Sequence, residues 1–236
     1  MEIQNSEFKI QNSDWLPFLL QTADALFPTG AYAHSLGFEE IVRLGVVRDE
    51  ATLRDFLLTQ IVPAQEHHEL PYLRFAREAA GLDELCAIDR EIDAWKLASE
   101  MRAASAQLGV RRLKALRTIS EAAELAQFES AIAAGRARGH HLVICALQAR
   151  AGGIPLTASL TAYFYQSLAA LCAAALKLIR IGQDGCQRAL RAAACDAQTV
   201  VRRSLTVART EAGWFNPLLE IASLRHARAE ERLFIS

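Results

Sequence analysis

The histidines and carboxylates of this chain are the side chains that could carry chemistry, and their spacing predicts no catalytic site. Glu66-His67-His68-Glu69 looks like a metal cluster. Adjacent residues on a helix point about 100° apart, however, so at most His68 and a residue three or four positions away could share an ion. We therefore expect a solvated polar start to a helix. His140-His141 has the same weakness, and we expect this pair to begin a helix after Gly139.

Other patterns typical of enzymes are missing or have a simpler interpretation. The sequence contains none of the motifs G-x-x-x-x-G-K-[ST], G-x-S-x-G and H-E-x-x-H, so we expect no P-loop, no bound cofactor and no metal. Four carboxylates lie at helical spacing from basic residues, which predicts a solvated face. They are Asp89, Glu91, Asp93 and Glu100, with Arg90, Lys96 and Arg102 as the basic partners.

Two stretches contain side chains that the formation of a helical fold does not by itself explain. The segment Phe27–Ser35, FPTGAYAHS, packs two aromatic rings, a histidine and a serine into a turn. It could act in binding, or it could be a helix-entry turn capped by Ser35. Near the C-terminus, Arg232-Leu233-Phe234 puts two apolar side chains and a forked donor on a segment that should fray. It could bind a partner or dock on the chain's own core.

Composition narrows the class of protein. The chain is 52% hydrophobic but only 7% aromatic, and Ala and Leu dominate, which favours helices. Its 26 Lys and Arg balance 27 Asp and Glu, so no field favours nucleic acid or an anionic membrane. The five cysteines form no C-x-x-C pair and are expected to be buried thiols in a reducing compartment. With no apolar leader at its start, the chain is expected to be cytoplasmic.

The elements are organised around the stretch Thr157 to Ile181, the longest weakly charged part of the chain. A helix that is apolar almost all round must be buried by other helices or by lipid. Its polar residues and many alanines favour the core of a soluble bundle over a membrane span. Two tyrosines, Tyr163 and Tyr165, combine apolar rings with polar tips, which suits either a dimer interface or the cap of a core.

The remaining segments are predicted to be helices or turns, so the fold class is all-α with about ten helices around the buried central helix. We expect a mobile tail over residues 1–13, one domain over 14–212, and a C-terminal helix with a partner-binding tail over 213–236. Asp14, Asp49 and Asn216 are expected helix caps. Pro63 is expected to break or kink a helix, and Gly213–Pro217 to form a hinge that leaves the tail loosely held.

Four stretches in this order resemble the UreF family of urease accessory proteins. They are LLQTADALFPTGAYAHSLGFEE, EMRAASAQLGVRRLKAL, the region from GHHLVICALQ to LIRIGQ, and PLLEIASLRHARAEERLFIS. The first follows the family pattern P-x-G-x-(aromatic)-x-x-S-x-G-x-E. The chain departs from the family at Ala31, Glu220, Ala227 and the segment 182–187.

The resemblance implies a non-enzymatic homodimer that binds UreD (also called UreH) and recruits and regulates the GTPase UreG, so that nickel is inserted into the urease apoprotein. By resemblance, Tyr165 belongs to the dimer contact, and Tyr32 contacts Arg232. The partner-binding residues expected are Tyr32, His34, Ser35, Glu39, His226, Arg232, Leu233, Phe234 and Ser236. Two alternatives remain open: a helical interaction module unrelated to urease, and an all-α enzyme that uses His34 or His226.

Overall fold

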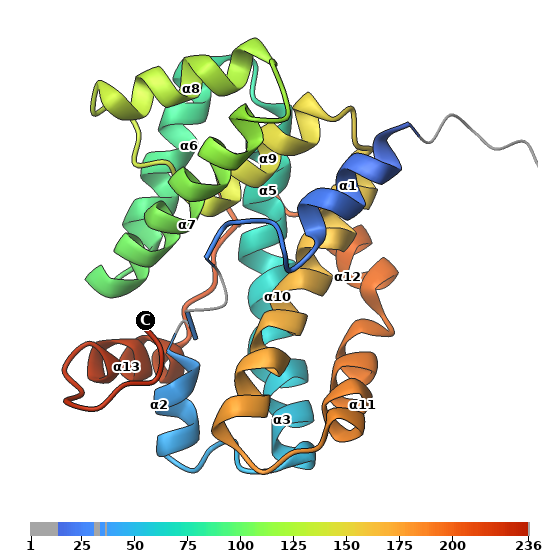
Figure 1. Ribbon diagram of the computed structural model, residues 1–236, viewed down its shortest axis with the longest axis vertical. Helices are drawn as coiled ribbons and strands as arrows, with labels where there is room; N and C mark the ends of the chain where they lie inside the picture. Colours follow the sequence, from blue (N-terminus) through green and yellow to red (C-terminus); the bar gives the residue numbers. More distant parts are fainter. Residues whose placement is uncertain (1–13, 31–33, 36, 236) are drawn as a thin grey trace, which may run out of the picture.

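The computed structural model describes residues 14–30, 34–35 and 37–235. The chain is 70% helical, and its described residues form 11 helices and no strand when the unbroken run from α3 to α5 (Glu50–Glu78) is counted as one; these pack into a compact body (Figure 1). The all-α fold class is confirmed. The expected mobile tail, residues 1–13, lies outside the described residues.

The helices connect through short loops. They are α1 (Trp15–Ala23), α2 (Phe38–Arg43), α3 (Glu50–Phe56), α4 (Val62–Ala64), α5 (Leu70–Glu78), α6 (Leu82–Trp95), α7 (Ser99–Arg117), α8 (Ala123–Ala133), α9 (His141–Ala151), α10 (Leu156–Leu178), α11 (Gln183–Ala194), α12 (Ala197–Ser204) and α13 (Pro217–His226). Two π-helical segments, η2 (Leu57–Ile61) and η3 (Gln65–Glu69), join α3, α4 and α5 into one continuous rod.

Pro63 does not break this rod, so of the two predicted outcomes, a break or a kink, the break is wrong. It lies in α4, and the π-helical segments η2 and η3 lie on either side of it. Proline removes one helical hydrogen bond and crowds the preceding turn, and wider turns are one way to relieve that crowding. The rod begins as expected at Asp49, whose carboxylate accepts the amide of Thr52 at 2.9 Å in a capping box.

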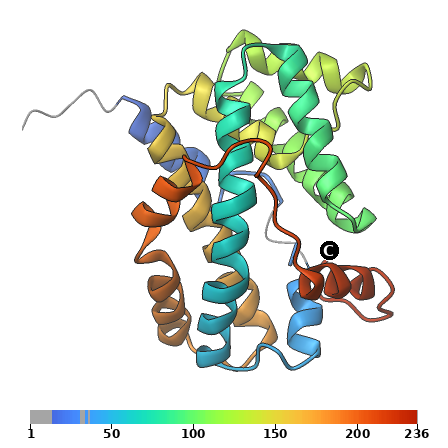
Figure 2. The same ribbon diagram turned by 180° about the vertical axis from the view of Figure 1, so that it is seen from behind.

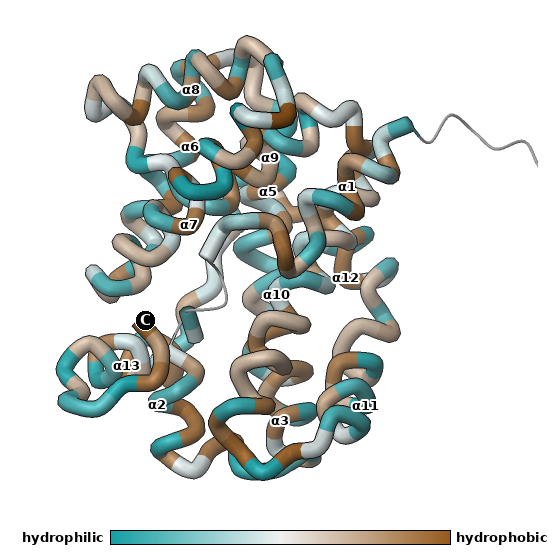
Figure 3. The backbone as a smooth tube through the Cα atoms, viewed as in Figure 1, coloured by the Kyte–Doolittle hydropathy of each residue, from teal (hydrophilic) through white to brown (hydrophobic). Residues whose placement is uncertain are grey.

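The core lies where α9, α10 and the rod meet. All eight residues from Leu142 to Ala149 on α9 are buried. On α10, Leu160, Phe164 and Leu168 are fully buried, whereas Tyr165 is 50% exposed. The apolar character of α10 (Figure 3) therefore serves the core on one face only, and α9 is the helix buried nearly all round.

By length and composition alone, α10 could also cross a membrane. In this chain it packs against α11, α12 and α5, which accounts for its apolar face. Four cysteines are buried as expected, while Cys195 is exposed.

The prediction of a solvated acidic face is wrong. Asp89 is completely buried and accepts the backbone amides of Arg138 at 2.5 Å and His140 at 2.8 Å, so it anchors the start of α9. Glu91 pairs with Arg209 at 2.6 Å. Each partner lies more than forty residues away in sequence, beyond the range of helical spacing.

Asp93, His140 and His68 also have partners that local helical spacing does not predict. Asp93 lies 3.0 Å from the ring of His140. His140 immediately precedes α9 and His141 begins it, as predicted for the pair His140-His141. His68 is not solvated either: it packs against Tyr72 and Trp95, and burial lowers its pKa to about 4. The surroundings of these groups are therefore set by tertiary packing.

Residues 205–216, here called the strap, run from α12 back along the rod to α13 (Figure 2). Arg74 donates to the carbonyl of Val207 at 2.6 Å, and the amide of Gly213 donates to the carbonyl of His67 at 2.9 Å. A Cβ on Gly213 would lie 2.4 Å from the Trp95 ring. The strap is thus anchored along its length, and the expected free hinge is not what the structure shows.

Candidate functional site

The candidate site begins at the entry to α2, inside the segment that resembles the family pattern. Gly37 has φ 83°, and a Cβ there would lie 2.6 Å from the Ser223 hydroxyl on α13, so glycine allows the two helices to touch. Ser35 accepts the amide of Glu39 at 3.3 Å. The N-cap of α2 is Gly37 and not Ser35, but the Ser35 hydroxyl binds one of the first amides of the helix, close to the capping role predicted for it.

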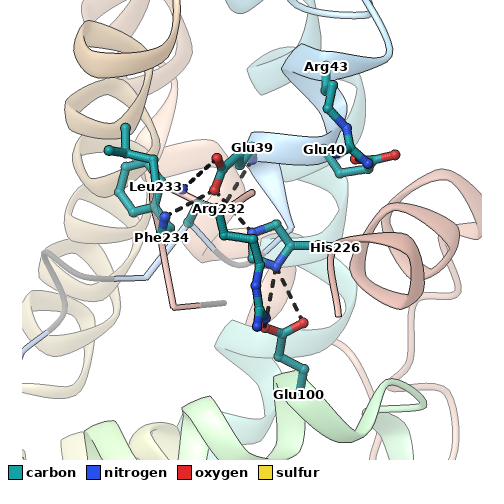
Figure 4. Close-up of polar contacts among 9 residues, drawn as sticks. Glu39, Glu40, Arg43, Glu100, His226, Arg232, Leu233 and Phe234 are labelled. Carbon is teal, nitrogen blue, oxygen red and sulfur yellow. Dashed lines mark hydrogen bonds and ion pairs between the residues drawn. The ribbon is translucent and has the colours of Figure 1, made fainter. Parts of the chain in front are cut away.

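Glu39 binds the backbone of the C-terminal tail. Its two carboxylate oxygens accept the amides of Leu233 at 2.8 Å and Phe234 at 3.0 Å (Figure 4). Burial would raise the pKa of Glu39, but the two amide bonds and His226 outweigh burial and hold the pKa below its usual value. The ionised carboxylate is therefore the form that retains the tail.

Three further side chains complete what we call the tail clamp: Glu100, His226 and Arg232, together with Glu39. His226 is 1% exposed, and its ring nitrogens lie 3.1 Å from Glu39 and 3.3 Å from Glu100. Arg232 donates to Glu100 at 3.1 Å. The clamp joins α2, α7, α13 and the tail, elements that are distant in sequence (Figure 4).

A second ionic contact holds α13 against α2. Glu40 is only 1% exposed and lies 2.7 Å from both Arg43 and Arg225. A buried carboxylate needs such partners, because its desolvation would otherwise be unfavourable. This contact fixes the helix that ends in the clamp residue His226.

The tail divides its three apolar residues between core and solvent. Phe234 is 4% exposed and lies under the Lys177 ammonium, 4.8 Å from the ring centre. Leu233 is 62% exposed and Ile235 58% exposed. The sequence allowed burial of both Leu233 and Phe234, and only Phe234 is buried.

Near the tail, two more apolar side chains face solvent. Ile221 and Leu224, three residues apart on one face of α13, are 53% and 48% exposed. Exposed apolar side chains gathered at one end of a molecule are typical of a surface that meets another protein.

The structure brings only some of the predicted site residues together. The structure brings Glu39, His226, Arg232, Leu233 and Phe234 together. His34 is buried, and burial followed by the nearby charge of Arg111 lowers its pKa. Tyr32 and Ser236 lie outside the described residues, and so does the expected contact between Tyr32 and Arg232.

Glu100 is the functional candidate that sequence reasoning missed. It was assigned to a solvated face, but it contacts His226 and Arg232 more than 120 residues away. A signal was present, because Glu100 opens the stretch EMRAASAQLGVRRLKAL that resembles the family.

The two tyrosines of α10 differ in their surroundings. The Tyr163 hydroxyl donates to Glu69 at 2.9 Å within the chain, and burial raises the pKa of this tyrosine well above its usual value. Its hydroxyl therefore needs no second subunit. Tyr165 is half exposed and offers ring and hydroxyl to a partner. Their placement in a dimer interface stays a prediction.

The tail clamp can hold a chain segment in place through ion pairs and hydrogen bonds. Both ring nitrogens of His226 face carboxylates, and Arg232 is paired, so these groups hold one another and the tail. Among the residues that the structure describes, no three His, Cys, Asp or Glu side chains are arranged to hold a metal ion.

Comparison with known proteins gives consistent matches. A family described as UreF matches residues 47–194. A urease accessory protein UreF from Arthrobacter sp. (strain FB24) is 36% identical over 218 residues, 92% of this chain and 96% of the relative. One from Paenarthrobacter aurescens (strain TC1) is 34% identical with the same coverage. A third, from Actinobacillus pleuropneumoniae, is 29% identical over 221 residues, 92% of this chain and 97% of the relative.

Proposed function

This chain belongs to the UreF family of urease accessory proteins, and from that premise we propose that it helps insert nickel into urease by binding other accessory proteins. In this proposal it binds a UreD-type protein (also called UreH) and then recruits a UreG-type GTPase. The three together act on the urease apoprotein, and nickel is their cargo.

One observation carries the proposal. The tail clamp joins Glu39 of the N-terminal family pattern to Leu233, 194 residues later, and so unites the two most distinctive stretches of the sequence in one place. Beside the clamp, Leu233 and Ile235 are exposed. A surface with ordered backbone, apolar side chains and a charged rim suits protein recognition.

The enzyme alternative finds less support. It would use His34 or His226, but both nitrogens of His226 already face carboxylates, and no nucleophile is positioned against that ring among its described contacts. The sequence also lacks a P-loop, so GTP hydrolysis would be supplied by the partner GTPase.

We further propose that the protein is a homodimer through the exposed face of α10, where Tyr165 is half exposed between small residues. The free cysteines support a cytoplasmic location. A net charge of −1 gives no reason to expect nucleic acid or membrane binding.

The decisive experiment is co-purification of the tagged chain with UreD-type and UreG-type proteins from the same genome. Arg232→Ala should weaken recruitment of the GTPase several-fold while leaving thermal stability nearly unchanged, because a partly exposed ion pair contributes only about 0–1 kcal/mol. Arg228→Ala is the matched control, since Arg228 is exposed nearby. Failure of the unmodified chain to retain either partner would refute the proposal.

A further inference from the structure

A second site lies away from the tail clamp, where the C-terminal ends of α5 and α9 meet the N-terminal end of α8, in the upper part of Figure 1. These three helix ends enclose an open cavity of about 530 Å³. Its charged lining consists of Arg77, Glu78, Glu124 and Arg150, and its other lining residues are alanines. The cavity is large enough for a small ligand.

Three of the four charged side chains already have partners of opposite charge. Glu78 lies 3.4 Å from Arg74, and Arg150 is paired with Glu124. Arg150 also donates to the carbonyl of Ala79 at 2.7 Å. Both carboxylates of the cavity are thus neutralised by arginines.

Arg77 is the exception. Its Nη2 reaches only the carbonyl of Ile154, at 3.5 Å, and its Nε is buried with no hydrogen-bond partner. Among the described residues, no carboxylate lies within 4.0 Å of this guanidinium. Burial and then the neighbouring Arg150 charge lower the pKa of Arg77, and the charges of Glu124 and Glu78, which form no ion pair with it, offset this only in part.

Besides Arg77 and Arg150, the start of α8 contributes positive potential to the cavity. Ala122, the residue before this 11-residue helix, offers no side-chain cap and lines the cavity with Glu124, so the N-terminal end of α8, the positive end of its dipole, lies at the cavity wall. An arginine fork without an ion-pair partner, beside the N-terminal end of a helix, matches the oxygen atoms of an anion.

We propose that this cavity binds a small oxoanion, of the phosphate or carboxylate type, with Arg77 as its principal cationic contact. The ligand would provide the direct ion-pair partner that Arg77 lacks and would accept hydrogen bonds from the terminal nitrogens of its guanidinium. This site is independent of the tail clamp and of the partner binding proposed above.

Calorimetric titration of the full chain with sodium phosphate, and separately with sodium citrate, tests the proposal at an ionic strength held constant with sodium chloride. We expect saturable binding of at least one anion, and at least tenfold weaker binding in Arg77→Gln. Arg203→Gln, which removes a 66% exposed arginine on α12, should bind like the parent. Binding of one anion only would identify the ligand type. No saturable binding, or equal binding by Arg77→Gln, would overturn the site.

A second variant keeps the test informative if Arg77→Gln folds poorly. Glu124→Gln removes the carboxylate that occupies Arg150, so Arg150 becomes available to the ligand. We expect several-fold tighter anion binding by Glu124→Gln, with an unchanged helical circular dichroism spectrum. Unchanged or weaker binding in this folded variant would contradict the proposal.

Discussion

At the residue scale, Glu39 connects the N-terminal family pattern to the end of the chain. Its two oxygens accept different tail amides, from Leu233 and from Phe234. In Glu39→Gln one oxygen becomes an NH₂ group, which cannot accept an amide hydrogen. We expect tail docking to weaken by about 1–3 kcal/mol, seen as faster cleavage of the tail by carboxypeptidase. Glu211→Gln, an exposed control, should leave cleavage unchanged.

The same contact should depend on pH. The pKa of Glu39 lies below the usual value of 4.5, because the tail amides and His226 favour the carboxylate and outweigh burial. The ionised form binds the tail, so docking is fully stable above about pH 4.5 and is lost as the pH falls through the lowered pKa. The NMR signals of the Leu233 and Phe234 amides should report this loss, and signals unchanged down to global unfolding would contradict it.

His68 should make the whole fold sensitive to acid. Burial lowers its pKa from 6.5 to about 4, so between these values the unfolded chain binds a proton that the folded chain does not. Stability should therefore fall as the pH decreases across this window, by about 3 kcal/mol in total. His141, with a pKa lowered to about 3 by burial and then by Arg112 and Lys96, acts in the same direction.

His68→Phe tests this contribution, because the ring packs against Tyr72 and Trp95. We expect urea unfolding of the variant to lose less stability between pH 7 and pH 5 than that of the parent, with His141 supplying the remaining dependence. Equal losses in the two proteins would show that His68 is not the responsible group.

At the scale of elements, α10 combines a buried face with an exposed one. The exposed face carries Tyr165, and the proposed dimer would cover it. Tyr165→Asp should therefore give a folded monomer, because an unpaired charge in an interface is strongly unfavourable. Light scattering measures the mass, and Leu58→Asp, which changes a 41% exposed residue of the rod, is the control. A parent protein that is already monomeric, or a dimeric variant, would exclude this interface.

Much of the helical layout follows from local sequence. The caps at Asp49 and at Asn216, whose side chain accepts the Leu218 amide at 3.1 Å, were both predicted, whereas Asp14, also predicted, makes no side-chain cap hydrogen bond at the start of α1. Local spacing could not reveal that Asp89 is buried beneath the start of α9, or that π-helical turns flank Pro63. Both features depend on segments that meet only in the folded chain.

At the scale of the whole molecule, α2, near the start of the chain, and the C-terminal tail meet at one site. The strap carries the chain back along the rod, α13 lies against α2, and the tail ends on Glu39 (Figures 1 and 2). Sequence resemblance selected most residues of this site, but not Glu100, and it left open which tail residue faces solvent. Only the fold separates the buried Phe234 from the exposed Leu233.

This separation predicts that adjacent tail residues have different roles. Leu233→Ser should leave the tail docked, because the Leu233 amide still reaches Glu39 and its side chain is 62% exposed. If a UreD-type partner covers that side chain, its loss should weaken binding by about 1.5–3 kcal/mol, roughly 10-fold to 100-fold.

Phe234→Ala should act through the tail itself. Because Phe234 is 4% exposed, truncating it should release the tail, increase its cleavage by carboxypeptidase and weaken the partner as a consequence. Co-purification and cleavage measured together distinguish the two residues: Leu233→Ser should change only the first, and Phe234→Ala both. Leu58→Ser, remote from the tail, should change neither. If Leu233→Ser bound the partner as well as the parent does, the exposed side of the tail could not be the recognition surface.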